Sequence, residues 1–335
     1  MIKIAIDAMG GDNAPEVIVQ GVLAAVQKYP DVHYMLYGDE VQIKKYMPEQ
    51  PKEVEIIHTT EEITFEDSPV KAVRSKKNSS LVLAARAVKE GTADALLSAG
   101  NTGALLAAGL LYIGRIKGIE RPGLMTTLPS VQDDLGTDFL DLGATSDSKA
   151  EFLNHYALLG SIYAQKVRGV EKPRVALLNN GTEATKGNDV TKAAYQLLEQ
   201  NQHINFIGNL EARDLLYGQA DVVVADGFTG NAVLKSTEGA ALAILKLLKQ
   251  NIKEGSLLSK LGALCLKPVF KKVAAKMDYT SHNGAILMGV KAPVVKSHGS
   301  SKPETIVACI EQIKTMIEGQ VISEVIAELE DMSVE

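Results

Sequence analysis

Residues 93–112, ADALLSAGNTGALLAAGLLY, contain a predicted strand, a glycine turn and a predicted helix, an order that recurs along the chain. The apolar run Ala93–Ala99 predicts a buried strand, the turn 100–103 ends that strand, and Ala104–Tyr112 has the composition of a helix. The same order recurs at 220–230, where Ala-Asp is followed five residues later by Gly-Phe-Thr-Gly. A strand that turns through glycine into a helix is typical of parallel α/β sheets.

Strands of this kind are predicted along the whole chain, each followed by a turn and a helical segment. They are expected at Ile2–Ile6, Val32–Tyr37, Val54–His58, Arg174–Leu178 and Asp221–Ala225. Strands that alternate with helices predict a mostly parallel sheet covered on both faces, which is a three-layer α/β/α, Rossmann-like fold. Because no low-complexity linker divides the chain, we expect a single α/β domain over residues 1–335.

The overall composition excludes several classes of protein. Among 335 residues the net charge is −6, which argues against nucleic-acid binding. Cys265 and Cys309 form no CxxC motif and are too few for a disulfide framework, so we expect reduced thiols and a cytoplasmic protein. The short run Met1–Asp7 does not have the length of a signal peptide, and no apolar run reaches about 18 residues, the length of a membrane span.

Four glycine-rich turns at predicted strand ends are candidates for binding an anion. Glycine lets the backbone approach a ligand closely, and the helix that follows offers unpaired N–H groups. A glycine at a helix start is also an ordinary structural feature, but four such turns rich in Asn, Thr and Lys favour a phosphate-type site. The candidate binding residues are Asp7, Gly10, Gly11, Asp12, Gly100, Thr102, Gly103, Gly181, Gly187, Asn188, Gly227, Thr229, Gly230 and Ser300.

None of these turns has the spacing of a dinucleotide or ATP fingerprint, so no cofactor is expected. The six histidines lack metal-ligand spacing, so no metal is expected. There is also no GxSxG motif that would indicate a nucleophilic serine.

Lys186 and His298 are the strongest catalytic candidates. Lys186 lies in a glycine-bounded loop and is expected to hold phosphate, although a solvated loop lysine is equally compatible with the sequence. His298 lies in the polar segment 296–301, KSHGSS, where an imidazole can bind phosphate or protonate a leaving group; a surface histidine is the alternative.

The segment Leu257–Met277 is basic within an acidic protein, since it has five lysines and no acidic residue. Its apolar residues recur at helical intervals, which predicts an amphipathic helical hairpin at about 251–277 that projects from the core. We expect it to meet an anionic membrane or an acidic protein; a dimer interface with solvated lysines is the alternative. The predicted contact residues are Lys260, Leu261, Leu264, Lys267, Lys271 and Lys272.

Several motifs together resemble the PlsX family of phosphate acyltransferases, in register from residue 2 to about residue 320. The segments that carry the resemblance are 7–15 (DAMGGDNAP), 76–80 (KKNSS), 98–104 (SAGNTGA), 181–183 (GTE), 186–188 (KGN), 226–231 (DGFTGN) and 298–301 (HGSS). The segment 141–145, DLGAT, departs from the family pattern because Asn is expected in place of Thr145, which leaves the role of this loop open.

The resemblance implies a fold similar to the isocitrate and isopropylmalate dehydrogenases and to phosphotransacetylase. It also implies reversible transfer of a long-chain acyl group from acyl carrier protein to inorganic phosphate, without a cofactor. The acyl phosphate would then pass to a membrane glycerol-3-phosphate acyltransferase for phosphatidic acid synthesis. Members of this family are homodimers that associate peripherally with the membrane. With this activity, the acidic protein that suits Leu257–Met277 would be the carrier protein, and the hairpin is expected to border the acyl channel.

For this chemistry we expect Lys186 to act on phosphate or the oxyanion, and Asn101 and Asn231 to act as hydrogen-bond donors. His298 is expected to assist the departing thiol, and the loop Asp7–Asp12 to shape the floor of the site. Two other functions remain open from the sequence: an oxidoreductase on the same fold that uses NAD and a metal, and a non-catalytic membrane scaffold of lipid synthesis.

Overall fold

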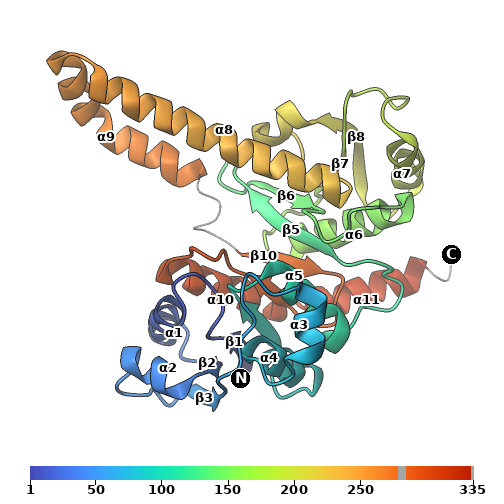
Figure 1. The fold of residues 1–335 in the computed structure, drawn as a ribbon. Coiled ribbons are helices and arrows are strands. Elements are labelled where there is room, and N and C mark those ends of the chain that lie inside the picture. Colours follow the sequence, from blue (N-terminus) through green and yellow to red (C-terminus); the bar gives the residue numbers. More distant parts are fainter. Residues whose placement is uncertain (278–283, 333–335) are drawn as a thin grey trace.

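The computed structural model describes residues 1–277 and 284–332 (Figure 1). The first elements along the chain are β1 (Ile2–Asp7), α1 (Glu16–Lys28), β2 (Val32–Gly38), α2 (Glu40–Tyr46), β3 (Val54–His58), α3 (Pro69–Ser75), α4 (Ser80–Lys89), β4 (Ala95–Ser98), α5 (Thr102–Ala108), the π-helical turn η1 (Gly109–Ile113), β5 (Gly123–Leu128) and β6 (Thr137–Leu140). The later elements are α6 (Ala150–Lys166), β7 (Arg174–Asn179), α7 (Asp189–Gln200), β8 (Asn205–Glu211), the 3-10 turn η2 (Ala212–Tyr217), β9 (Val222–Val224), α8 (Gly227–Glu254), α9 (Leu257–Met277), β10 (Ala285–Met288), β11 (Val294–Lys296), α10 (Pro303–Glu318) and α11 (Val321–Met332).

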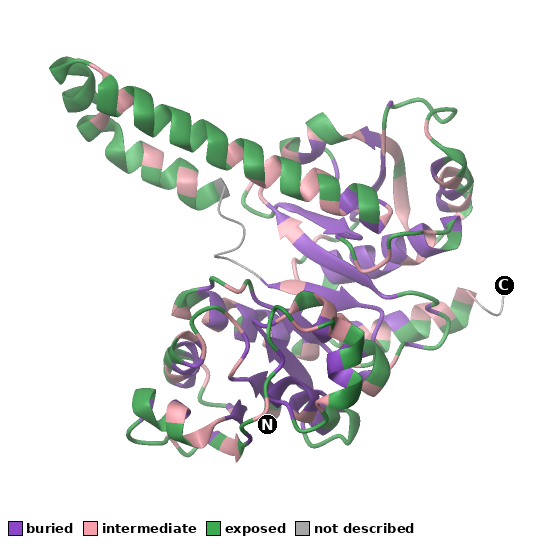
Figure 2. Cartoon of the chain, viewed as in Figure 1, coloured by how far each residue is buried: buried purple, intermediate pink, exposed green. Residues whose placement is uncertain are grey.

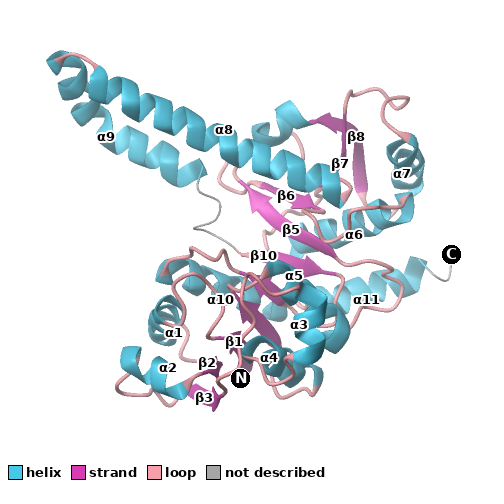
Figure 3. Ribbon diagram, in the orientation of Figure 1, coloured by secondary structure: helices cyan, strands magenta, loops and turns pink. Residues whose placement is uncertain are grey.

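The eleven strands of the described residues form one sheet in the order β3-β2-β1-β4-β11-β10-β5-β6-β9-β7-β8. Figure 3 shows strands in magenta with helices packed around them. Seven of the ten pairings are parallel; the pairs β10–β11, β10–β5 and β5–β6 are antiparallel. The prediction of a mostly parallel α/β sheet is therefore confirmed. The antiparallel pairs separate a first block, β3-β2-β1-β4-β11, from a second block, β6-β9-β7-β8, and the two blocks run in opposite directions.

The sheet is covered on both faces, as a three-layer arrangement requires. Side chains of alternate strand residues enter different clusters: Ile4 and Ile6 pack with α1, α6, α10 and α11, whereas Ala5 between them packs with α3, α4 and α5. Behind the second block, Phe139 and Val223 pack with η2 and the start of α8. The core is mostly aliphatic, as expected from a chain without Trp.

The predicted strands lie within one or two residues of the observed ones. Val54–His58 is matched at both ends, and Ile2–Ile6 extends by one residue to Asp7. The helix predicted at Ala104–Tyr112 begins earlier, at Thr102, and its last part is the π-helical turn η1. The strands β5, β6, β8, β10 and β11 are absent from the prediction.

The two copies of the repeated sequence pattern occupy equivalent positions in the two blocks. The Asp94 carboxylate accepts a hydrogen bond from the backbone N–H of Lys3 at 2.7 Å, and the Asp221 carboxylate accepts one from the N–H of Arg174 at 2.7 Å. Each aspartate precedes its strand and fastens it to the start of a parallel neighbour, β1 or β7. The pattern thus fixes the same strand pairing in each block.

Helices α8 and α9 form a hairpin that projects from the rest of the molecule (Figure 1). The projecting hairpin, residues 242–277, is longer than the hairpin predicted at 251–277 because its first helix continues without a break from Gly227. Its surface is largely exposed (Figure 2). Seven apolar side chains of α9 are at least half exposed: Leu257, Leu258, Leu261, Leu264, Leu266, Val269 and Val273. No helix in the described part of the chain is long and apolar enough to cross a membrane.

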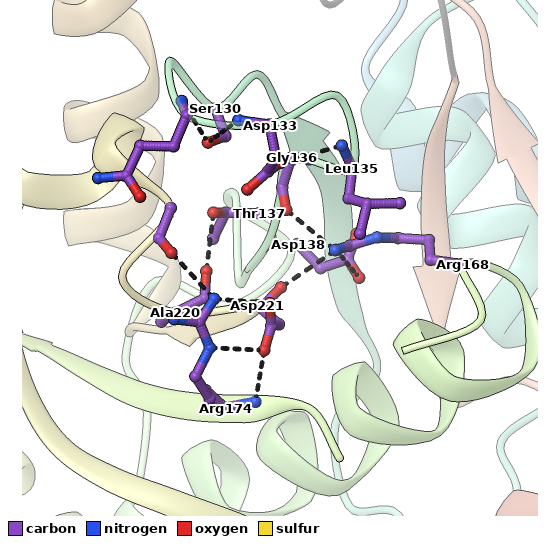
Figure 4. A network of polar contacts seen from close by, with 12 residues as sticks. Ser130, Asp133, Leu135, Gly136, Thr137, Asp138, Arg168, Arg174, Ala220 and Asp221 are labelled. Atoms are coloured by element: carbon purple, nitrogen blue, oxygen red, sulfur yellow. Dashed lines mark hydrogen bonds and ion pairs between the residues drawn. The ribbon is translucent and has the colours of Figure 1, made fainter. Parts of the chain in front are cut away.

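A buried ion pair fixes α6 to the amino ends of β6 and β9 (Figure 4). Arg168 donates to Asp138 at 2.8 Å and to the backbone oxygens of Gly136 and Asp221. The Thr127 hydroxyl donates to the other oxygen of Asp138 at 2.6 Å. Burial raises the pKa of Asp138 to about 6, and the neighbouring guanidinium of Arg168 opposes this shift. The charge of Asp138 is therefore tolerated in the core because Arg168 balances it.

We expect Arg168→Met to lower the free energy of unfolding at pH 7 by about 3–5 kcal/mol, because it leaves the Asp138 carboxylate buried without a partner. A carboxyl whose folded pKa is raised stabilises the fold at low pH and loses that contribution as the pH rises through this pKa. The loss should therefore shrink as the pH falls from about 7 to about 5. Urea unfolding at both pH values measures it.

Arg174→Met is the matched control. Its bidentate pair with Asp221 is more exposed, with 43% of the Arg174 side chain accessible, so we expect a loss of about 1 kcal/mol or less. Equal losses for the two variants would show that the burial of the Arg168 pair has no energetic consequence.

Candidate active site

A cavity of about 230 Å³, here called the central cavity, lies where the carboxyl ends of β11 and β6 approach each other. The middle strands form its floor, and α5 and α8 form its walls. The lining residues are Thr102, Leu124, Thr126, Leu142, Asn231, Leu234, Lys235, Glu238, Ala285, Lys296, Ser297 and His298. Of the predicted catalytic residues, the structure brings Asn231 and His298 together here, with Thr102 beside them.

Lys296 is the principal residue that the sequence analysis missed. It is the last residue of β11, between Ser98 of β4 and Ala285 of β10, and only 9% of it is exposed. Its ammonium donates to the backbone oxygens of Ala99, at 3.3 Å, and Ser297. Burial lowers the pKa of Lys296 to about 8. The available signal was a lysine at the end of an apolar run, directly before a polar loop.

Asp7 ends β1 and organises the loops next to Lys296. Its carboxylate accepts hydrogen bonds from Ser80 at 2.6 Å, Ser98 at 2.7 Å and the backbone N–H of Met9 at 3.3 Å. Burial raises the pKa of Asp7, and these donors oppose that shift. Residue 10 has to be glycine because a Cβ there would lie 2.5 Å from the Asp7 carboxylate. Asp7 thus has a structural role at the base of the site.

His298 presents one ring nitrogen as a donor. Its Nδ1 accepts a hydrogen bond from the backbone N–H of Ser300 at 3.3 Å and lies 2.9 Å from the Ser300 hydroxyl. Because a backbone N–H can only donate, the neutral ring carries its proton on Nε2. The predicted residue Ser300 thus orients the imidazole, and the Nε2–H is left to serve a ligand.

Asn231 lies in the second turn of α8, half-buried at the wall of the central cavity. The cap of this helix is Asp226, which accepts from the N–H of Thr229 at 2.8 Å. Asn231 is therefore not a capping residue, and within the described residues its amide has no hydrogen-bond partner. Gly230 allows the helix to start against the backbone oxygen of Asp141, which a Cβ would strike.

The loop that departs from the family pattern is held by its backbone. Asp141 accepts from the N–H groups of Gly143, Ala144 and Thr145 at 2.9–3.1 Å, and from that of Leu124 at 2.8 Å. Since every residue except proline has an N–H, Thr145 satisfies this arrangement without an asparagine side chain. The departure leaves the loop around Asp141 intact.

Asn101 has a structural position. Its Oδ1 accepts from the N–H of Ala104 as the cap of α5, and its amide donates to the backbone oxygens of Thr64 and Phe65. The geometry therefore gives no support to Asn101 as a donor to substrate, and that role stays a prediction. The next residue, Thr102, lines the central cavity, and Gly103 lies against Pro69 of α3.

The predicted site of Lys186 lies elsewhere. Its loop borders a second hollow of about 390 Å³, lined by Gly187, Asn188, Asp226 and Thr229 among others, on the other side of the start of α8. Lys186 is exposed, and its aliphatic stem lies against Gly181. Asn188 caps α7 by accepting from the N–H of Thr191. The phosphate-binding role of Lys186 stays a prediction, and the structure does not place it with His298.

The remaining predicted residues lie around a third hollow of about 400 Å³ that Gly11, Asp12 and Gly100 line. The N–H of Asp12 donates to the backbone oxygen of Gly299 at 2.8 Å, which joins this loop to the loop of His298. Gly227 starts α8 close to the Asp141 carboxylate. Among the described residues, no group of three or more His, Cys, Asp or Glu side chains is placed to hold a metal.

Comparison with known proteins agrees with this architecture. The model of a family described as "Fatty acid synthesis protein" matches residues 2–324. A phosphate acyltransferase of Enterococcus faecalis is 57% identical over 326 residues, which are 97% of this chain and 98% of that protein. A phosphate acyltransferase of Streptococcus uberis is 59% identical over 324 residues, which are 97% of this chain and 96% of that protein.

Among solved structures, a phosphotransacetylase from Streptococcus pyogenes superimposes with a TM-score of 0.61 at 17% identity, over 96% of this chain and 94% of that one. The expected likeness to the phosphotransacetylase fold is confirmed; the likeness to the isocitrate and isopropylmalate dehydrogenases stays a prediction. Family model and relatives both cover nearly the whole chain, so this protein is an acyltransferase that belongs to the phosphate acyltransferase family of fatty acid synthesis.

Proposed function

We propose that this enzyme transfers a long-chain acyl group reversibly from acyl carrier protein to inorganic phosphate and releases an acyl phosphate. The observation that carries the proposal is the central cavity, which joins a buried cation and two neutral donors to an apolar wall. Leu124, Leu142 and Leu234 form this wall. An anionic acceptor and an acyl thioester thus find complementary surfaces in one place.

The chemistry needs no nucleophilic side chain. Phosphate is a nucleophile at neutral pH, so one of its oxygens attacks the thioester carbonyl carbon, and the resulting oxyanion collapses with loss of the thiolate. The amide of Asn231 and the Nε2–H of His298 are the donors proposed to stabilise the oxyanion and the departing sulfur. The reverse reaction uses the same groups.

A row of hollows continues from the central cavity along α8; the first is mostly apolar, and the last is also lined by Asp133, Asp134 and Lys276. A small hollow lined by Leu128, Pro129, Leu216 and Ala241 shares Leu234 and Glu238 with the central cavity. It shares Leu128 and Pro129 with a wider hollow of about 440 Å³ that reaches Ala275 and Lys276 of α9. We propose that the acyl chain follows this row of hollows toward the base of the projecting hairpin.

The projecting hairpin is proposed to rest on an anionic membrane, where a product as apolar as acyl phosphate leaves most readily. Each exposed leucine of α9 contributes about 1.5–3 kcal/mol if it is fully buried, and each lysine about 1 kcal/mol near anionic headgroups. A membrane glycerol-3-phosphate acyltransferase is the proposed consumer of the product. The homodimer and the cytoplasmic, peripherally membrane-associated location belong to the same proposal.

The function is tested by incubating the purified protein with acyl-acyl carrier protein, phosphate and hydroxylamine, which traps acyl phosphate as a hydroxamate. We expect phosphate-dependent hydroxamate and free carrier in equal amounts. Acyl-CoA in place of the carrier tests the donor. A protein that gives no hydroxamate with either donor is the scaffold, and reduction of NAD with an added metal would indicate the oxidoreductase.

Asn231→Leu should lower kcat/KM by about a hundredfold, which is the expected cost of one lost oxyanion donor. Since Asp226 caps α8, the melting temperature is expected to change by less than about 3 °C. Thermal melting and the hydroxamate assay measure the two effects. A steep fall in melting temperature with unchanged activity per folded molecule would make Asn231 a structural residue.

Changing Leu261 and Leu264 together to Glu should abolish flotation with liposomes that contain phosphatidylglycerol and leave activity on the dissolved carrier substrate within about twofold, because the site lies at the other end of α8. Gln200→Glu with Gln202→Glu adds the same charge away from the hairpin and is expected to float like wild type. A variant that still floats would contradict the membrane proposal, and one that falls into inactive monomers would indicate a dimer interface.

A further inference from the structure

Lys296 is a buried charge without a direct counter-ion. Within residues 1–277 and 284–332, no carboxylate lies at ion-pair distance from its ammonium, whose hydrogen bonds go to two backbone oxygens. Buried ammonium groups in proteins are normally paired, because desolvation costs several kcal/mol per ion. The arrangement is therefore incomplete as an ion pair.

The nearest acids influence Lys296 without contacting it. Both oxygens of Asp7 are occupied by Ser80, Ser98 and Met9. The carboxylates of Asp12 and Asp7 oppose the effect of burial on the pKa of Lys296 from a distance, which helps to keep the ammonium charged. The protein thus maintains a cation here and leaves its partner to be supplied.

The position of Lys296 indicates what that partner is. An ammonium has three N–H groups, two of which serve Ala99 and Ser297, so one remains for a ligand in the central cavity that Lys296 lines. The Nε2–H of His298 and the amide of Asn231 line the same cavity. Lys235 and Glu238 of α8 also line the cavity with one charge of each sign, so the buried Lys296 and the two neutral donors set its preference for a small oxyanion with several acceptor oxygens.

We propose that Lys296 is the counter-ion of the acceptor phosphate, and that its ammonium donates a hydrogen bond to a phosphate oxygen in the central cavity. This inference rests on the function proposed above. Attack of another phosphate oxygen forms the C–O bond and breaks the C–S bond, the electron pair leaves with sulfur, and the proton lost by hydrogen phosphate neutralises the thiolate. Lys296 stays protonated throughout.

A buried charge that binds a substrate should lower the stability of the protein without that substrate. If Lys296 binds the substrate, its buried charge destabilises the protein without phosphate. An apolar residue of similar length at this position should then leave the free energy of unfolding unchanged or raise it. Lys296→Met is therefore expected to melt at the same temperature as wild type or higher. In about 20 mM inorganic phosphate, wild type should be stabilised further and the variant should not.

The experiment measures the dissociation constant of inorganic phosphate by calorimetry and its KM in the hydroxamate assay. Loss of a charge-assisted hydrogen bond should raise both for Lys296→Met by about thirtyfold. Lys296→Gln keeps a donor for the backbone oxygens but has no charge, and it should lose phosphate affinity similarly. Lys291→Met makes the same change at the exposed turn between β10 and β11 and should behave as wild type.

Phosphate affinity at the wild-type level in Lys296→Met or Lys296→Gln would overturn the assignment. The assignment would also fail if Lys296→Met melted far below wild type and Lys296→Gln kept full phosphate affinity. That pair of results would mean that Lys296 only stabilises the fold. If wild type itself makes no hydroxamate, the proposed function fails independently of Lys296. If wild type makes hydroxamate and both variants bind phosphate normally, only the assignment of Lys296 fails.

Discussion

The short antiparallel middle of the sheet is the constraint on which the site depends. Parallel sheets bind ligands at the carboxyl ends of their strands, and two blocks that run in opposite directions present these ends at opposite edges of the sheet. The middle strands β10, β5 and β6 have only four to six residues, so residues at the end of β11 and just after β6 still line the same cavity. Short side chains on the middle strands, such as Thr126 and Ala285, leave room for a ligand between α5 and α8.

Two buried aspartates fix the loops on either side of this cavity. Asp7 is the last residue of β1 in the first block, and Asp141 directly follows β6 in the second. Each carboxylate accepts several hydrogen bonds. Glycine accompanies each of them, Gly10 beside Asp7 and Gly230 against the backbone of Asp141, because the chain passes too close for a Cβ. Asp7 and Asp141 therefore hold the loops that border the central cavity.

The sequence predicts the layers and the strands β1, β2, β3, β4, β7 and β9 well because their signals are local. Ile2–Asp7 and Val54–His58 are short segments rich in isoleucine and valine that end at turns, as strands of a buried parallel sheet do. The middle strands β10 and β11 have four and three residues, too few for a periodicity, and their place in the sheet depends on partners far away in the chain. Lys296 was missed for the same reason, since only its neighbours Ser98 and Ala285 show that it is central. Asn231 and His298, predicted by motif, line one cavity, whereas the loop of Lys186 borders another hollow, because sequence alone gives no distance between loops. The catalytic roles of all three stay predictions.

Helix α8 begins beside Asn231 and continues without interruption into the projecting hairpin, so the two share one rigid rod about 42 Å long. If the outer end of α8 tilts, the inner end of the same rigid helix has to change its orientation as well. A tilt of the hairpin would therefore change the orientation of Asn231 and the shape of the hollows along the helix. The contact that the hairpin makes and the position of Asn231 in the central cavity would both depend on the angle of this one helix.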